Sequence, residues 1–415
     1  MDDYLIQVGQ KAQAASDILR QASSQEKDQA LALMAEALRA DQEAILKSNQ
    51  EDIQLAQSKG RSEAFIERLS LNDNRIEAMA QGLESMMSLA DPLNQTIREW
   101  RNDQGLLISQ RPVPLGVIGI IYESRPNVTV DATGLCLKSG NATILRGGSD
   151  AFSSNRAIVY ALQKGLHTSK LPTNAIQLIT NPSYAIADQL MQLTDYVDCL
   201  IPRGGGKLIQ RVVDTAKVPV IETGVGNCHL YMHGAADLNK AIPILVNGKT
   251  QRVSVCNALE TLLVDQTHLD NLETILAPLI KQGIEIRGDQ ATCQRIPEAI
   301  LANPEDYATE FLDKIIAVKV VEGYDQALDH IRSYSTGHSE AIVTEDYSVA
   351  QAFMNQVDSA AVYVNASTRF TDGAMFGMGG EIGISTQKLH ARGPMGLEAL
   401  TSYKYVIQGE GQIRD

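Results

Sequence analysis

The sequence predicts an α/β protein with two lobes, each built on a parallel β-sheet, and an extended arm outside both. The first observation is size, since 415 residues with 44% hydrophobic side chains can bury more than one core. The second is two successive series of short β-branched runs that alternate with longer amphipathic stretches, a pattern typical of parallel sheets covered by helices. The third is an isolated extended segment near residue 110 and an alternating segment near residue 405 that fit neither series.

The first 90 residues or so predict a helical lead-in. They are rich in Ala, Gln, Leu, Glu and Met, with apolar residues at helical spacing at Ala30, Leu31, Met34 and Leu38. The breaker Asp91-Pro92 ends this region. We expect the following stretch, 106–113, to form an extended arm.

Each series of apolar runs predicts the strands of one sheet. The first series comprises 117–122, 142–145, 175–180, 197–201 and 218–221. The second comprises 229–232, 259–264, 284–286, 315–321, 341–344 and 361–364. The stretch 401–408 alternates Tyr403, Tyr405 and Ile407 with polar residues, so we expect a late strand there.

Composition excludes several classes of protein. The formal net charge is -14, from 36 Lys and Arg against 50 Asp and Glu, and no basic block could follow a nucleic-acid backbone. No apolar run approaches the roughly 20 residues of a membrane helix, and the acidic start, Asp2-Asp3, lacks a signal pattern. Five cysteines without paired short spacings indicate free thiols. We therefore expect a cytoplasmic protein that contacts neither nucleic acid nor membrane.

The triplet Gly204-Gly205-Gly206 is the best candidate for a phosphate-binding turn, because neither of the usual glycine-rich nucleotide motifs is present. It follows a predicted strand, opens a predicted helix and is flanked by Arg203 and Lys207. Free N–H groups at a helix start suit a phosphate, although an ordinary surface turn is the alternative.

Arg146 ends a predicted strand, at the edge where open α/β sheets bind ligands, and is therefore a candidate ligand-binding residue. The alternative is a solvated surface charge. Cys256 is a candidate nucleophile, since nearby Arg252 and polar residues can lower a thiol pKa; the alternative is an inert core cysteine. Cys228 and His229, with His233, superficially resemble a metal cluster. Their alternation with apolar residues fits a buried strand better, so we predict no metal site.

The stretch 219–227, which contains Glu222-Thr223-Gly224, resembles the glutamate-glycine motif of the aldehyde dehydrogenase superfamily. That resemblance implies a catalytic cysteine 34 residues after the glutamate, and Cys256 stands there. It also implies an aldehyde dehydrogenase-like fold. Two departures stand out: Ser254-Val255 replaces the usual Gly-Gln, and the expected lysine does not follow Glu222. Both fit an enzyme that does not activate water, so we place Glu222 among the cofactor-binding residues rather than as a base.

Further landmarks of the superfamily occur in the expected order. The resemblance implies that Asn127 stabilises the oxyanion, that Arg146 and Gly204-Gly205-Gly206 bind the cofactor's adenosine ribose and pyrophosphate, and that Glu310 binds its nicotinamide ribose. Arginine at position 146 also suits the 2′-phosphate of NADPH.

Three longer strings, 123–129, 364–373 and 390–396, resemble most specifically the branch of the superfamily that reduces γ-glutamyl phosphate in proline synthesis. The resemblance therefore implies NADPH-dependent formation of glutamate 5-semialdehyde and phosphate through a thioacyl intermediate on Cys256. Arginines suited to the anionic substrate are Arg125, Arg369, Arg252 and Arg392. The alternatives are a water-using or coenzyme A-acylating aldehyde dehydrogenase, or an inactive superfamily member that acts as a binding protein.

The resemblance also divides the chain. It implies a cofactor-binding domain from 1–91 and 117–227, a catalytic domain from 228–372, and an oligomerisation arm and tail from 92–116 and 373–415. An isolated arm and a late strand need a partner to cover their edges, so we expect a homo-oligomer. Glutamate 5-kinase, which would supply the unstable substrate, is a candidate transient partner.

Overall fold

The computed structural model describes residues 2–414, which form two compact units. Within these residues, unit 1 consists of 2–223, Gly377–Gly383 and 395–414, and unit 2 consists of Gly224–Phe376 and Ile384–Pro394. The chain passes from one unit to the next after Thr223, four residues before the boundary that the sequence predicted. The stretch 219–227 therefore contributes residues to both units.

The helical lead-in is confirmed. It comprises α1 (Asp3–Leu19), α2 (Ser24–Ala40), α3 (Gln42–Ser58), α4 (Glu63–Leu69) and α5 (Asp73–Met87). Helix α2 starts at a capping box in which Ser23 and Glu26 satisfy each other's backbone N–H groups. Lys27 on this helix is fully buried and pairs with Asp91 at 2.5 Å, so the predicted breaker is also an anchor for the helices.

Unit 1 contains a four-stranded parallel sheet in the order β5 (Ile176–Leu178), β4 (Ala142–Arg146), β3 (Val117–Tyr122) and β6 (Cys199–Arg203). Its crossover helices are α6 (Asn127–Lys138), α7 (Phe152–His167) and α8 (Tyr184–Leu190), and α9 (Gly206–Thr215) follows β6. The prediction of a fifth strand at 218–221 was wrong, because this stretch makes only the single bridge Leu200↔Val220. Pro219 accepts a hydrogen bond from Leu200 but has no N–H with which to extend a ladder.

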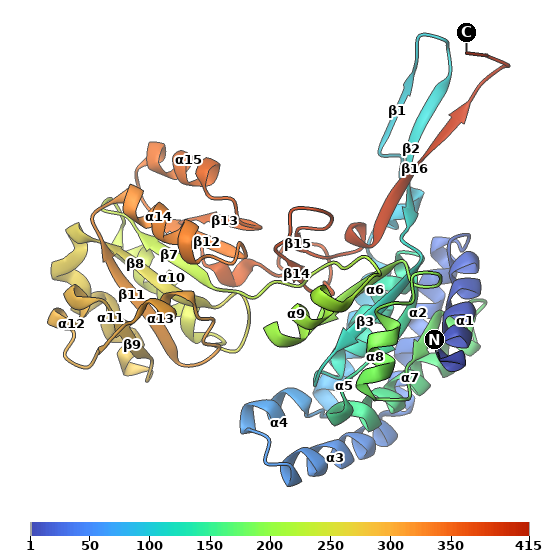
Figure 1. The fold of residues 1–415 in the computed structure, drawn as a ribbon, viewed down its shortest axis with the longest axis horizontal. Coiled ribbons are helices and arrows are strands. Elements are labelled where there is room, and N and C mark those ends of the chain that lie inside the picture. Colours follow the sequence, from blue (N-terminus) through green and yellow to red (C-terminus); the bar gives the residue numbers. More distant parts are fainter. Residues whose placement is uncertain (1, 415) are drawn as a thin grey trace. The chain divides into compact units, whose positions relative to one another are not determined.

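The arm is a three-stranded antiparallel sheet of unit 1 in the order β1 (Arg98–Arg101), β2 (Leu107–Pro114) and β16 (Thr401–Gln408). Figure 1 shows these strands extending away from the helices of their unit. The late strand is confirmed residue for residue, and it pairs with β2 along its whole length. Tyr403, Tyr405 and Ile407 on β16 are each more than half exposed.

Unit 2 is built on a seven-stranded parallel sheet. Its order is β10 (Ile300–Leu301), β9 (Glu285–Gly288), β11 (Ile315–Val321), β8 (Leu259–Asp265), β7 (Cys228–Met232), β12 (Ser339–Val343) and β13 (Ala361–Val364). All six strands of the second predicted series are confirmed, and only the two-residue β10 was not predicted. The helices are α10 (Leu238–Thr250), α11 (Leu272–Lys281), α12 (Gln290–Arg295), α13 (Pro304–Ala308), α14 (Tyr324–Tyr334) and α15 (Tyr347–Gln356).

Short elements complete both units. A two-stranded antiparallel ribbon joins β14 (Ile384–Ser385) to β15 (Gly393–Pro394). The 3₁₀ turns are η1 (Pro92–Asn94), η2 (Ser149–Ala151), η3 (Thr173–Ala175), η4 (Gln266–Asn271), η5 (Thr368–Phe370) and η6 (Glu398–Leu400).

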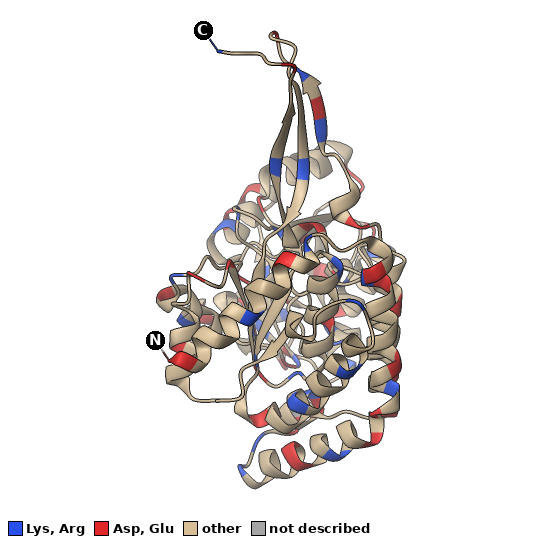
Figure 2. Ribbon diagram, turned by 90° about the vertical axis from the view of Figure 1, so that its right-hand side faces the viewer, with Lys and Arg blue, Asp and Glu red and all other residues tan. Residues whose placement is uncertain are grey.

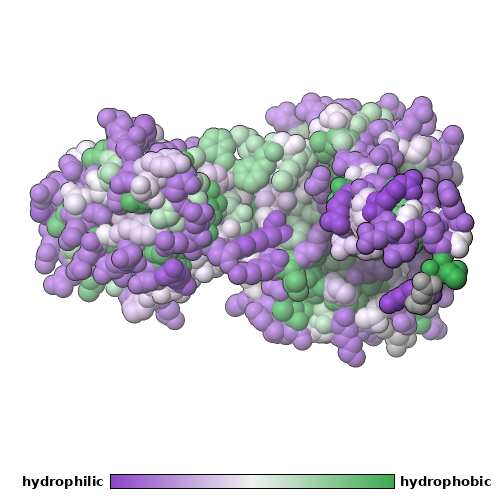
Figure 3. All heavy atoms as spheres, turned by 90° about the horizontal axis from the view of Figure 1, so that it is seen from above, coloured by the Kyte–Doolittle hydropathy of each residue, from purple (hydrophilic) through white to green (hydrophobic). Residues whose placement is uncertain are grey.

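Charged residues of both signs are mixed along the described part of the chain in the view of Figure 2. Figure 2 shows acidic and basic residues interspersed over the helices, and in Figure 3 hydrophilic residues cover most of the visible face of each unit. Among residues 2–414, no helix combines the length and apolar character needed to cross a bilayer. The same residues contain no group of three or more His, Cys, Asp or Glu side chains arranged to hold a metal ion.

Candidate active site

Cys256 lies in an irregular segment of unit 2 between α10 and β8, and its side chain is partly exposed. A buried ion pair brackets this segment: Lys249 in the last turn of α10 and Glu260 on β8 meet at 2.6 Å with both side chains fully buried. Burial raises the pKa of Glu260 to about 7. The pair therefore ties together the two elements that flank Cys256.

Burial disfavours the thiolate form of the remaining four cysteines. Cys136, Cys199 and Cys228 are buried, and burial raises the pKa of the first two to about 12 and that of Cys228 well above its ordinary value. Cys228 also donates its thiol hydrogen to the Cys256 carbonyl at 3.2 Å. Cys293 is partly exposed, but its pKa is also raised by burial. The geometry favours Cys256.

Gly226 packs directly on the backbone of Cys256. A Cβ at position 226 would lie 1.5 Å from the Cys256 carbonyl oxygen, so no side chain fits there. The Gly226 N–H donates to Glu310 at 2.7 Å, while burial raises the pKa of Glu310. The structure therefore places the Glu310 carboxylate in contact with the glycine that packs on Cys256, and the cofactor role of Glu310 stays a prediction.

The loop that carries Arg369 is hydrogen-bonded to Asn257, the residue after Cys256. The Asn257 side chain donates to the Thr371 carbonyl at 2.9 Å, and the Thr368 hydroxyl donates to the Asn257 carbonyl at 2.8 Å. Arg369 donates through Nε to Gln251 at 3.0 Å. Desolvation lowers the pKa of Arg369, and Cys256 opposes this shift. The structure therefore brings Arg369 into the electrostatic surroundings of Cys256.

The other two predicted arginines of unit 2 lie in different settings. Arg252 is exposed, and its charge contributes to lowering the pKa of Arg369. Arg392 donates to the Asp358 carboxylate at 2.8 Å and to the Asp358 carbonyl at 2.7 Å. Hydrogen bonds from Lys388 and Arg392 lower the pKa of Asp358 to about 2. Arg392 is thus engaged by a carboxylate of its own unit, and its substrate role stays a prediction.

In unit 1, the glycine triplet lies where the sequence predicted, between the end of β6 and the first turn of α9. One of its N–H groups is already used, since Gly205 donates to the Glu123 carboxylate at 3.0 Å. A Cβ at Gly204 would lie 2.7 Å from the same carboxylate. An acidic side chain therefore occupies an anion position at the start of α9, which the sequence analysis did not anticipate.

Arg146 ends β4 and is largely buried, at 8% exposure. It donates to the Pro182 carbonyl at 2.8 Å, and its Nε has no hydrogen-bond partner among the described residues. Its guanidinium lies over the Tyr184 ring, 5.9 Å from the centroid. Desolvation lowers its pKa. The alternative of a solvated surface charge is excluded.

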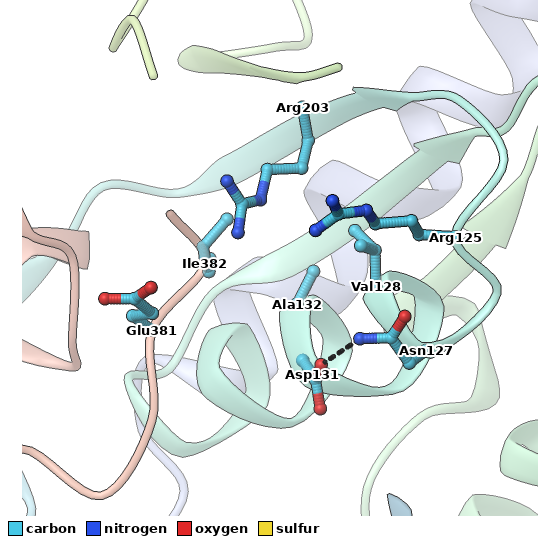
Figure 4. Close-up of a pocket in the computed structure, with 8 residues that line it drawn as sticks. All are labelled: Arg125, Asn127, Val128, Asp131, Ala132, Arg203, Glu381 and Ile382. Carbon is cyan, nitrogen blue, oxygen red and sulfur yellow. Dashed lines mark hydrogen bonds between the residues drawn. The ribbon is translucent and has the colours of Figure 1, made fainter. Parts of the chain in front are cut away.

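A pocket of unit 1 brings together Arg125 and Asn127 with three charged residues that the sequence analysis did not select as site residues, Arg203, Asp131 and Glu381. Figure 4 shows the guanidinium groups of Arg125 and Arg203 pointing toward the same space. Asn127 donates to Asp131 at 3.0 Å, one helical turn away on α6. The Asn127-Asp131 spacing was a usable signal, because residues four apart on a helix lie on one face.

Glu222 lies in the extended segment at the end of unit 1, and its side chain is partly buried. Cys256 belongs to unit 2 and Asn127 to unit 1. The roles of Glu222 and Asn127 therefore stay predictions.

Comparison with known proteins identifies the family of the chain. The profile of the family described as "Aldehyde dehydrogenase family" matches residues 4–290. The chain belongs to the aldehyde dehydrogenase family. An acetylating aldehyde dehydrogenase from Geobacillus thermoglucosidasius, 19% identical, shares the fold with a TM-score of 0.72 over 100% of this chain and 98% of its own.

Similarity to one group within the family is much higher. The γ-glutamyl phosphate reductase of Heliobacterium modesticaldum is 57% identical over 407 residues, 98% of each chain. That of Lactiplantibacillus plantarum is 54% identical over 411 residues, 99% of each chain. The crystal structure of γ-glutamyl phosphate reductase from Thermotoga maritima, 48% identical, matches with a TM-score of 0.96 over 99% of this chain and 100% of its own. Within its family, the chain groups with the γ-glutamyl phosphate reductases.

Proposed function

We propose that this chain reduces γ-glutamyl phosphate to glutamate 5-semialdehyde and phosphate, the reductive step of proline synthesis from glutamate, with NADPH as donor and Cys256 as nucleophile. The observation that carries the proposal is the setting of Cys256, a partly exposed thiol whose neighbour Asn257 is hydrogen-bonded to the loop that carries Arg369. A cation beside the thiol favours the reactive thiolate and offers a partner for an anionic substrate. The full-length similarity to γ-glutamyl phosphate reductases supports the same chemistry.

In this mechanism, the Cys256 thiolate attacks the acyl carbon of the substrate. A C–S bond forms, the C–O bond to phosphate breaks, and phosphate leaves with the electron pair. Arg369 and Arg252 offset the negative charge of the substrate, and we propose the Asn127 amide and the Cys256 N–H as donors to the oxyanion. When bound, the nicotinamide supplies the hydride that reduces the thioester. Cys256 then leaves as thiolate, the C–S bond breaks, and the aldehyde is released.

The cofactor-binding residues fit a phosphorylated dinucleotide. The buried Nε of Arg146 lacks a hydrogen-bond partner among the described residues, so a phosphate oxygen would satisfy it. The N–H groups that open α9 suit the pyrophosphate, once Glu123 has moved away from Gly205. Glu310 would accept from a ribose hydroxyl, and the Gly226 N–H fixes the orientation of its carboxylate. We therefore propose NADPH rather than NADH as the hydride donor.

The test is the reverse reaction, the phosphate-dependent reduction of NADP by glutamate 5-semialdehyde. Wild type, Cys256→Ala and Cys293→Ala are compared, because Cys293 is the other partly exposed cysteine and serves as a matched control. We expect activity that requires phosphate, is abolished in Cys256→Ala and is retained in Cys293→Ala. Activity without phosphate would indicate a water-using dehydrogenase, and activity that requires coenzyme A would indicate an acylating dehydrogenase. Absence of activity would indicate an inactive binding protein.

We further propose that the protein works in the cytoplasm as a homo-oligomer that receives its substrate from glutamate 5-kinase. Tyr403, Tyr405 and Ile407 support self-association, because they place half-exposed apolar side chains along one strand of the arm. Light scattering of the purified protein at several concentrations tests the oligomer, and a monomer at all of them would contradict it.

A further inference from the structure

The pocket of unit 1 in Figure 4 combines opposite charges in one small space. Arg125 lies in the loop after β3, and Arg203 is the last residue of β6, the neighbouring parallel strand. Asp131 comes from α6, and Glu381 from the segment Gly377–Gly383 that returns to this unit. Ligands of open α/β sheets bind at this carboxyl edge of the strands.

Arg203 packs closely against Gly383, and one of its nitrogens lacks a hydrogen-bond partner among the described residues. A Cβ at Gly383 would lie 3.3 Å from one of its terminal nitrogens, so the chain passes directly over the guanidinium. Its buried Nε has no hydrogen-bond partner among the described residues. A guanidinium offers five donors in a rigid fork that matches a carboxylate, so an acceptor from a ligand would complete this site.

The acidic groups restrict what that ligand can be. Asp131 lies close enough to Arg203 for the guanidinium charge to lower its pKa, although burial is the larger effect and raises the pKa to about 6. The two carboxylates match the two guanidinium groups of the pocket in number, and they disfavour a simple anion such as phosphate. They attract a ligand that carries its own cation. An α-amino acid has both charges on adjacent atoms.

We propose that this pocket binds the α-ammonium and α-carboxylate groups of the substrate's glutamyl moiety, with Arg203 and Arg125 on the carboxylate and Asp131 and Glu381 on the ammonium. The inference rests on the proposed function and deepens it, since it accounts for selection of an amino-acid semialdehyde over simple aldehydes. Two methylene groups separate the α-carbon from the acyl carbon of the substrate. A head group in this pocket therefore leaves the acyl carbon near the pocket rim, where Asn127 is exposed.

The test is binding of L-glutamate, which carries the head group but cannot react, to the full-length protein by titration calorimetry. The variants are Arg203→Gln and Asp131→Asn, and the control is Arg20→Gln, an exposed arginine of the same unit that pairs with Asp17. We expect about tenfold weaker binding of L-glutamate in each pocket variant, the effect of one charge-assisted hydrogen bond, and no change in the control. Glutarate, which lacks the ammonium, should bind Arg203→Gln more weakly than wild type and Asp131→Asn at least as tightly as wild type.

Because calorimetry measures binding without turnover, its outcome is independent of the outcome of the activity assay. Unchanged L-glutamate binding in both variants overturns the proposal, as does absence of L-glutamate binding by wild type, even if phosphate-dependent activity is present. An equal loss of inorganic phosphate binding in Arg203→Gln also overturns it, because the pocket would then be a phosphate site. Circular dichroism of each variant confirms that weakened binding does not reflect unfolding.

Discussion

Replacing Gly226 with alanine tests whether this glycine sets the position of the nucleophile. The added Cβ would lie 1.5 Å from the Cys256 carbonyl oxygen and 2.4 Å from its carbonyl carbon. Non-bonded carbon and oxygen atoms approach to about 3.3 Å at closest, so the two backbone segments must separate by roughly 1.8 Å. The clash is with backbone atoms, and a rotamer change cannot relieve it.

The expected loss of activity follows from that displacement. Moving a reacting group by about 1 Å costs on the order of 100-fold in rate, so we expect kcat/KM of Gly226→Ala to fall at least that far. The Gly226 N–H that donates to Glu310 should shift as well, and we therefore expect KM for the nicotinamide cofactor to rise.

The assay is the initial rate of phosphate-dependent NADP reduction, with the alkylation rate of Cys256 by iodoacetamide as a second readout. Gly82→Ala is the control, because its Cβ would meet nothing closer than 3.9 Å and alanine favours its helix. A folded Gly226→Ala protein with wild-type kcat/KM and alkylation rate would refute the reasoning, since the contact would then not position Cys256.

Three further substitutions have defined outcomes. Glu123→Gln removes a negative charge from the start of α9 but keeps the shape of the side chain. We therefore expect NADPH to bind about two- to fivefold more tightly in a fluorescence titration at low salt. Weaker binding would show that the carboxylate assists cofactor binding. His330 is buried, and its pKa is lowered to about 3, chiefly by desolvation, so the folded state resists protonation and the free energy of unfolding falls as the pH drops below about 6.5. In urea unfolding, His330→Phe should remove up to about 1.4 kcal/mol of this loss per pH unit. His167→Phe, at an exposed site, should not remove it. Lys249→Met leaves Glu260 buried without its cation and should lower the free energy of unfolding by about 3–5 kcal/mol, and Glu260→Leu in the same chain should restore most of it; a single variant as stable as wild type would contradict this.

The fold was largely predictable because its strands are buried apolar runs between turn residues. Strand β3 is buried along its whole length, and β11, β13 and β16 have the predicted limits. The failures have physical causes. Strand β10 has only two residues, both exposed, and β1 has three exposed residues and one partly exposed residue, so neither carries a run of buried apolar residues. The stretch 218–221 carries the pattern, but Pro219 prevents it from completing a ladder.

The site was predictable only where one short segment carries the signal. Cys256 followed from its spacing to Glu222, and the glycine triplet from its place between a strand and a helix. The contact of Gly226 with Cys256 and that of Glu123 with Gly205 join residues 30 or more apart in the sequence, and only tertiary packing creates them. The contact of Arg203 with Gly383 could not be predicted for the same reason, because the two residues are far apart in the sequence.

An acidic protein that binds anionic ligands must use local cations, and this chain keeps several of them partly out of water. Arg146 is largely buried against the Pro182 carbonyl, and Arg369 donates to the Gln251 amide, so the bonds that these two groups make are to neutral acceptors. Desolvation lowers the pKa of each below the ordinary range of a guanidinium, so both sites disfavour the charge they hold. A bound anion relieves that cost directly, whereas the net charge of -14 repels anions that lack the right shape. Selectivity for the phosphorylated substrate then depends on which guanidinium groups a ligand reaches together, and not on long-range attraction.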